Sequence, residues 1–116
     1  MFKKSLVALL VAAIAVVFTM SAFAAKGDVA KGKTVFATNC AMCHGDAGKG
    51  DGAAAAALVP KPRNFTDKAL MSKKTDDDLF KVVTKGSPNT GMAPYEKMLS
   101  EDDRWNAIAF IRTLAK

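Results

Sequence analysis

The pattern of apolar and polar residues predicts helices separated by loops, with almost no sheet. In residues 101–114, apolar side chains recur every three to four positions, which places a broad apolar stripe on a helix. Ser100 and three acidic residues precede this stripe and are typical of a helix start. Thr75 and three aspartates give the same signature before another apolar segment, which ends at Gly86. A further helix begins near Asp28, a good N-cap, and runs toward the cysteines. The chain is therefore expected to be all-α.

The segments between these helices hold residues that break regular structure. Residues 45–52 include four glycines, which predict a loop. Pro60 and Pro62 favour an extended backbone, because each proline biases the residue before it away from the α-helical region. Residues 86–99 form a second loop, and this one contains two methionines. The chemistry-bearing residues outside the helices are therefore expected on these loops.

The N-terminus has the three parts of a secretory signal peptide. Residues 1–4 are basic, residues 6–18 are apolar, and residues 22–24 fit the small-x-small rule for cleavage. An uncleaved membrane anchor is the alternative, but the apolar run is short for a span of about 20 residues. We expect cleavage after Ala24 and export to a bacterial periplasm or its equivalent. Residues 25–116 then form one small domain.

The charge balance limits the kinds of partner. The whole chain has a formal net charge of +6, with acidic and basic residues interspersed and without a long basic run. Nothing in the sequence reads as a nucleic-acid-binding motif, so we expect no nucleic acid partner. A protein partner with an acidic surface fits better.

Both cysteines and the only histidine fall in the sequence Cys40-Ala41-Met42-Cys43-His44. The C-x-x-C-H pattern is the attachment site of a c-type haem. On a helical turn, positions three apart share one face, so two thiols at this spacing can each add to one haem vinyl group. The adjoining imidazole then lies under the macrocycle, where it can bind the iron as proximal ligand. We therefore predict one covalently bound haem c with its iron.

Three other interpretations compete for these residues. A structural zinc site needs four ligands, and the chain offers only three Cys and His residues. A thioredoxin-like redox pair belongs in a strand–helix–strand unit, which the pattern does not predict. A structural disulfide with a surface histidine is the remaining alternative.

A methionine on the far side of the iron would complete His/Met ligation, which raises the reduction potential and closes the site to small ligands. Met92 follows a glycine and lies two residues before Pro94, in the part of the loop able to fold across a haem face. Met98 abuts the capped start of the last helix and is expected in the core, as gap-filling methionines often are. Met92 is the preferred ligand; Met98, another ligand or none are the alternatives.

On these residues the chain resembles the small monohaem class I cytochromes c of bacteria. The resemblance covers essentially all of residues 25–116, and it is carried by residues 40–45, 48–52, 60–65, 91–95 and 99–114. The family usually has proline directly after the ligand methionine, whereas here Ala93 intervenes. The resemblance implies the cytochrome c fold, with three to five helices packed around one covalently attached haem. It also implies that Gly32 and Phe36 on the first helix meet Phe110 on the last.

The resemblance implies further contacts around the haem. In the family, a proline carbonyl accepts a hydrogen bond from the proximal histidine, and such a contact fixes the ring. Pro60 and Pro62 are both candidates for this role. Arg63 either faces a haem propionate, as a charge-assisted pair, or is an ordinary surface arginine.

The expected function is one-electron transfer between periplasmic or membrane redox partners, by a carrier that is not an enzyme and is a monomer. Both axial positions would be filled, and no membrane span would remain after signal cleavage. Transient docking on acidic partners would use lysines around the haem edge, such as Lys49, Lys61, Lys85 or Lys97. The alternatives are a haem subunit of a larger oxidoreductase and a haem sensor or enzyme with an open sixth position.

Overall fold

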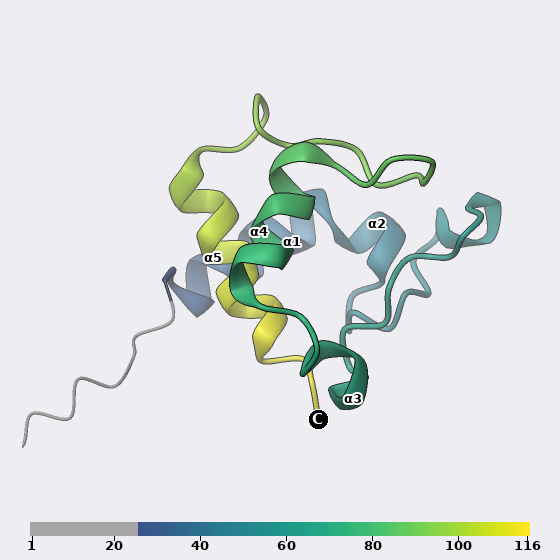
Figure 1. Cartoon of the computed structure of the whole chain (residues 1–116), viewed down its shortest axis with the longest axis horizontal. Coiled ribbons are helices and arrows are strands. Elements are labelled where there is room, and N and C mark those ends of the chain that lie inside the picture. Colours follow the sequence, from purple (N-terminus) through teal and green to yellow (C-terminus); the bar gives the residue numbers. More distant parts are fainter. Residues whose placement is uncertain (1–25) are drawn as a thin grey trace, which may run out of the picture.

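The computed structural model describes residues 26–116, so the expected signal peptide at 1–24 lies outside the described residues. The described part is helical and contains no strand (Figure 1). Its elements are α1 (Val29–Asn39), α2 (Ala41–His44), the 3₁₀ turn η1 (Ala55–Ala57), α3 (Lys68–Met71), α4 (Asp76–Lys85) and α5 (Glu101–Arg112). The prediction of an all-α chain is confirmed.

Side-chain caps explain where the three longer helices begin. The Asp28 carboxylate accepts a hydrogen bond from the Lys31 amide at the start of α1. Thr75 and Asp78 form a reciprocal capping box on α4, and the Ser100 hydroxyl caps α5. Each of these starts agrees with the sequence pattern. The short helix α3 was not anticipated, because its apolar pattern spans a single turn.

The first and last helices pack closely at Gly32. A side chain at this glycine would collide with the Asn106 carbonyl of α5, so α1 and α5 touch through their backbones here. Next to this contact, the rings of Phe36 and Phe110 lie 5.2 Å apart between centroids. The expected contact between a glycine and two aromatic residues is confirmed. Phe36 is only 1% exposed, whereas Phe110 is partly buried, so Phe36 carries more of the core.

We expect Gly32→Ala to lower the free energy of unfolding by about 2 kcal/mol or more, because overpacking a rigid backbone contact typically costs about 1–3 kcal/mol and sometimes more. At an exposed helical position, the same substitution would instead raise the free energy of unfolding by about 1 kcal/mol. Chemical denaturation of the holoprotein measures the difference. Ala37→Gly, at an exposed position of α1, is the control. It should lower the free energy of unfolding by about 1 kcal/mol. Stabilisation by Gly32→Ala would contradict the close contact.

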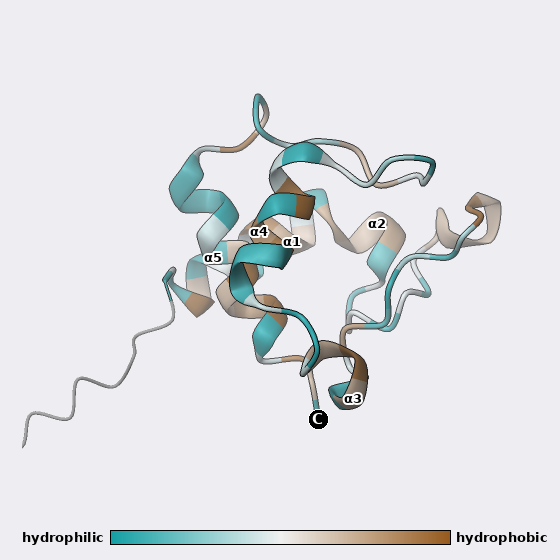
Figure 2. Ribbon diagram, in the orientation of Figure 1, coloured by the Kyte–Doolittle hydropathy of each residue, from teal (hydrophilic) through white to brown (hydrophobic). Residues whose placement is uncertain are grey.

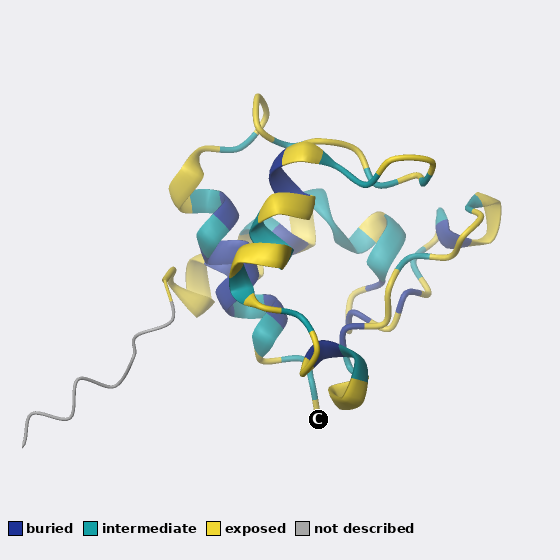
Figure 3. Ribbon diagram, viewed as in Figure 1, coloured by how far each residue is buried: buried dark blue, intermediate teal, exposed yellow. Residues whose placement is uncertain are grey.

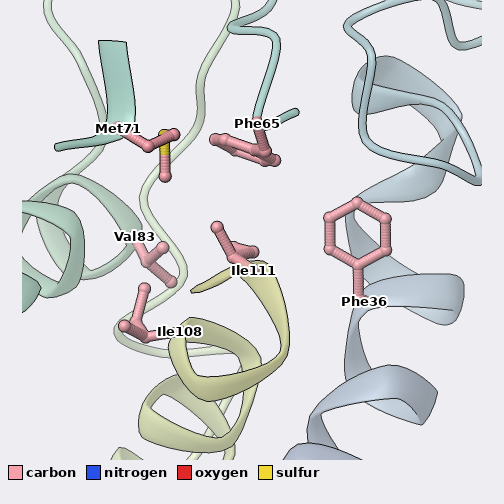
Figure 4. Packing of buried hydrophobic residues seen from close by; sticks show 6 residues of the cluster. All are labelled: Phe36, Phe65, Met71, Val83, Ile108 and Ile111. Atoms are coloured by element: carbon pink, nitrogen blue, oxygen red, sulfur yellow. The ribbon is translucent and has the colours of Figure 1, made fainter. Parts of the chain in front are cut away.

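The buried core gathers residues from four helices and the loop before α3. Figure 4 shows Phe65, Met71, Val83, Ile108 and Ile111 around one interior, with Phe36 on α1 completing the cluster. Figure 2 shows apolar residues on the helices that meet there, and Figure 3 shows buried positions concentrated along α5. The α5 helix is therefore the central support of the fold.

The C-terminal end of α5 is fastened to the segment between α3 and α4. The Arg112 guanidinium donates to the Met71 carbonyl at 2.9 Å and to the Lys74 carbonyl, and it pairs with Asp76 at 2.6 Å. Its side chain is 27% exposed. This half-buried network holds Met71 and the start of α4 in place against α5.

Candidate functional site

The turn between α1 and α2 carries the three residues of the attachment motif. Cys40 follows the last residue of α1, and Cys43 and His44 lie on the single turn of α2. The His44 amide donates to the Cys40 carbonyl at 2.9 Å, which is the helical hydrogen bond of this turn. All three side chains line one cavity. The local spacing in sequence is thus sufficient to bring both thiols and the imidazole to one place.

That cavity has a volume of about 510 Å³, within the range of cofactor pockets. Its walls are mainly apolar and come from helices and loops throughout residues 39–111; they include Leu58, Phe65, Met71, Leu79, Val83 and Ile108. In Figure 1, α4 and α5 lie on one side of the molecule, and α2 with the long loop after it lies on the other. The residues that line the cavity therefore come from both sides of the molecule, beside the attachment turn.

The His44 ring is held by two contacts. Its Nδ1 donates to the Arg63 carbonyl at 3.2 Å, and its face stacks on Phe65 with ring centroids 4.3 Å apart. Burial lowers the pKa of His44, and the hydrogen bond to Arg63 opposes this effect in part. With the Nδ1 proton engaged, the Nε2 lone pair is left to serve as a metal ligand.

The expectation that a proline carbonyl accepts this hydrogen bond is wrong, because the structure gives the role to Arg63. The Pro62 carbonyl lies against Gly50 instead, where any added side chain would meet it at 2.5 Å. Pro60, Pro62 and Arg63 all line the cavity, so these residues contribute to the site. The Arg63 residue is exposed, and its established contact with His44 is through the backbone.

The structure separates the two methionines of the 86–99 loop. Met92 is partly buried and lines the cavity that His44 lines. Met98 is 66% exposed, so the expectation that it belongs to the core is wrong. The residue lies in the turn before α5, where the Met98 amide donates to the Tyr95 carbonyl at 3.0 Å. Of these two thioethers, only that of Met92 lines the cavity.

Both cysteines are free thiols, so the alternative of a disulfide is not realised in the structure. Burial, with a smaller contribution from Cys43, raises the pKa of the Cys40 thiol to about 11. That thiol is therefore protonated at neutral pH. Within residues 26–116, no group of three or more Cys, His, Asp or Glu side chains has the arrangement of a metal site.

The donor set fits a c-type haem. The residues that carry two thiols at the C-x-x-C spacing, an oriented imidazole and a thioether all line one apolar cavity. Covalent attachment needs the two thiols, and the imidazole and the thioether are groups that can bind haem iron. A bound macrocycle would also cover the apolar walls, whose contact with water is unfavourable.

Two aromatic residues of the site had no role assigned from the sequence. Phe65 stacks on His44, and Tyr95 lines the cavity while its hydroxyl donates to the Asn39 carbonyl at 3.0 Å. Burial raises the pKa of Tyr95, so its phenol keeps the proton that it donates. Both lie in segments that carry the family resemblance, 60–65 and 91–95, but nothing in the sequence pattern gave either ring a role.

The lysines expected around the site differ in their surroundings. Lys61 is exposed and lines the cavity, and Lys49 and Lys97 are exposed as well. Lys85 forms an exposed ion pair with Glu96 at 2.7 Å, so its charge is largely compensated.

No helix within residues 26–116 is long and apolar enough to cross a membrane.

Comparison with known proteins gives consistent matches. The family model for cytochrome c matches residues 29–115. Cytochrome c-554(547) of Halothiobacillus neapolitanus is 35% identical over 94 residues, covering 76% of this chain and 98% of the relative. A chain of the Kuenenia stuttgartiensis reducing HAO-like protein complex superposes with a TM-score of 0.66 and 31% identity, over 78% of this chain and 44% of that one. Cytochrome c6 of the diatom Phaeodactylum tricornutum gives a TM-score of 0.56 and 25% identity, over 77% of this chain and 95% of that one.

Proposed function

The chain belongs to the cytochrome c family, and from that premise we propose that it is an exported one-electron carrier with His44 and Met92 as its axial ligands. As a small class I c-type cytochrome, it has one covalently bound haem. When bound, the haem supplies a single iron that cycles between the ferrous and ferric states. Cys40 and Cys43 are the residues that would hold it by thioether bonds.

One observation carries the proposed ligation. The Met92 side chain and the His44 ring line the same apolar cavity as the two thiols, whereas Met98 is 66% exposed. The Arg63 carbonyl and the Phe65 ring hold the His44 imidazole, so protein contacts alone set the orientation of the ring. If His44 and Met92 both bound the iron, no position on it would be open to a substrate, which is why we propose a carrier and not an enzyme.

The remaining parts of the proposal concern place and partners. We infer cleavage after Ala24, export to the periplasm and a monomeric carrier, from the signal-like N-terminus and the single domain. Docking on acidic partners is supported by exposed lysines, of which Lys61 is at the cavity itself. Because Lys85 is already paired with Glu96, we expect it to contribute less to docking than Lys61.

A second candidate function is that of a haem subunit in a larger oxidoreductase. The match to one chain of the reducing HAO-like complex supports it, because there a domain like this one is less than half of a longer chain. Purification of the native protein under mild conditions, followed by size analysis, distinguishes a free carrier from a subunit.

The carrier proposal predicts a closed iron. We expect the reduced holoprotein to bind carbon monoxide poorly at neutral pH, because Met92 occupies the position that the gas needs. Absorption spectra recorded with and without carbon monoxide measure this. Rapid and complete binding would contradict the proposal and favour a sensor or enzyme with an open sixth position.

A further inference from the structure

We propose that Tyr95 is a positioning residue for the distal ligand, because its hydroxyl ties the loop that carries Met92 to the end of helix α1. The inference rests on the proposed ligation by Met92. It assigns to Tyr95 the task of limiting how often that loop opens and Met92 leaves the iron.

The geometry places this tie next to the attachment turn. The Tyr95 hydroxyl donates to the Asn39 carbonyl at 3.0 Å, across 56 positions of sequence. Asn39 is the last residue of α1 and immediately precedes Cys40. The last carbonyls of a helix have no partner within it, so a donor from elsewhere satisfies one of them here. One hydrogen bond thus links the distal loop to the residue that precedes the first attachment cysteine.

The other hydrogen bonds near Met92 keep the loop in shape without fastening it to α1. The Met92 carbonyl accepts from the Ser87 amide at 3.1 Å, and the Met92 amide donates to the Thr90 hydroxyl at 3.1 Å. The Thr90 hydroxyl in turn donates to the Ser87 carbonyl at 2.7 Å. These three bonds all lie within the loop, so they would survive if the whole loop moved away from the iron.

The base of the loop is bound to α4 through the backbone. The Tyr95 amide donates to the Val83 carbonyl at 2.9 Å, and the Glu96 amide donates to the Thr84 carbonyl at 3.2 Å. Among the hydrogen bonds of residues 26–116, only that of the Tyr95 hydroxyl joins residues 86–99 to α1 or the attachment turn. Tyr95 is therefore positioned to act as a clasp between the two ligand-bearing segments.

Removal of the clasp should raise the population of the open loop. A partly buried hydrogen bond contributes enough to change such an equilibrium by about two- to tenfold. An external ligand that binds only the open state gains apparent affinity by the same factor, because its dissociation constant scales inversely with the open fraction. Tyr95→Phe removes the hydroxyl and keeps the ring that lines the cavity.

The test is a titration of the ferric holoprotein with imidazole. It is monitored through a weak charge-transfer band at the red end of the visible spectrum, which marks iron–methionine ligation in the ferric state. We expect Tyr95→Phe to retain the band without imidazole and to bind imidazole about two- to tenfold more tightly than the unaltered protein. Asp28→Ala is the control, because it removes one hydrogen bond at the far end of α1, from the Lys31 amide at 2.9 Å. It should lower the thermal midpoint while its imidazole affinity stays unchanged.

Each other outcome has a distinct meaning. Unchanged imidazole affinity in Tyr95→Phe, with the band present, overturns the clasp and leaves Met92 ligation intact. An equal gain in Asp28→Ala also overturns it, because general destabilisation would then explain the effect. Absence of the band from the unaltered protein contradicts Met92 ligation itself, and the clasp fails with it.

Discussion

Met92→Ala is expected to remove the weak charge-transfer band at the red end of the visible spectrum of the ferric protein. Loss of the thioether should also lower the reduction potential by on the order of 0.1 V or more, since axial ligands set haem potentials over a range of about 0.8 V. The reduced variant should bind carbon monoxide rapidly and completely, because the sixth position is open. Absorption spectroscopy and a redox titration measure these three effects.

Met98→Ala is the matched control for this prediction. Both substitutions remove a methionine from the same loop, but Met98 is 66% exposed and does not line the cavity. We expect the Met98 variant to keep the band and the potential, with little change in stability. Loss of the band only in the Met98 variant would refute the assignment of Met92 and leave the family membership untouched.

Replacement of both Cys40 and Cys43 by alanine should abolish covalent attachment of the haem. The unaltered protein should keep its haem through extraction with acidified acetone and have the mass of the processed chain plus one haem. The double variant should lose the haem completely, and each single variant should retain one thioether bond. A double variant that kept its haem on extraction would contradict the assigned attachment site.

Loss of the haem should also unfold the chain. An apolar cavity of about 510 Å³ that stayed open would cost about 12 kcal/mol, at roughly 24 cal/mol per Å³ of cavity. That cost is comparable to the whole stability of a typical domain, which is about 5–15 kcal/mol. We therefore expect the haem-free double variant to lack the helical circular dichroism signal of the holoprotein. A folded haem-free chain would mean that the cavity walls collapse on each other.

The sequence alone determined the features that depend on close neighbours in the chain. The C-x-x-C-H spacing brings two thiols and an imidazole to one turn, since residues three and four apart share a helix face. The starts of α1, α4 and α5 follow from capping residues, which bond to amides two or three positions away. Met92 was favoured for its place in a loop shaped by a glycine and a proline, and it does line the cavity.

Only the tertiary structure decided which distant segments meet. The acceptor for His44 is the Arg63 carbonyl and not that of a proline. Every residue has a carbonyl, so side-chain identity cannot reveal which one points at the ring. The same limit applies to the 86–99 loop. The exposure of Met98 and the hydrogen bond from Tyr95 to Asn39 both depend on how this loop lies against α1. The hydrogen bonds of His44 and Tyr95 span 19 and 56 positions of sequence. They form because the whole chain packs around the cavity, and a local sequence pattern does not reveal which loop will reach which helix.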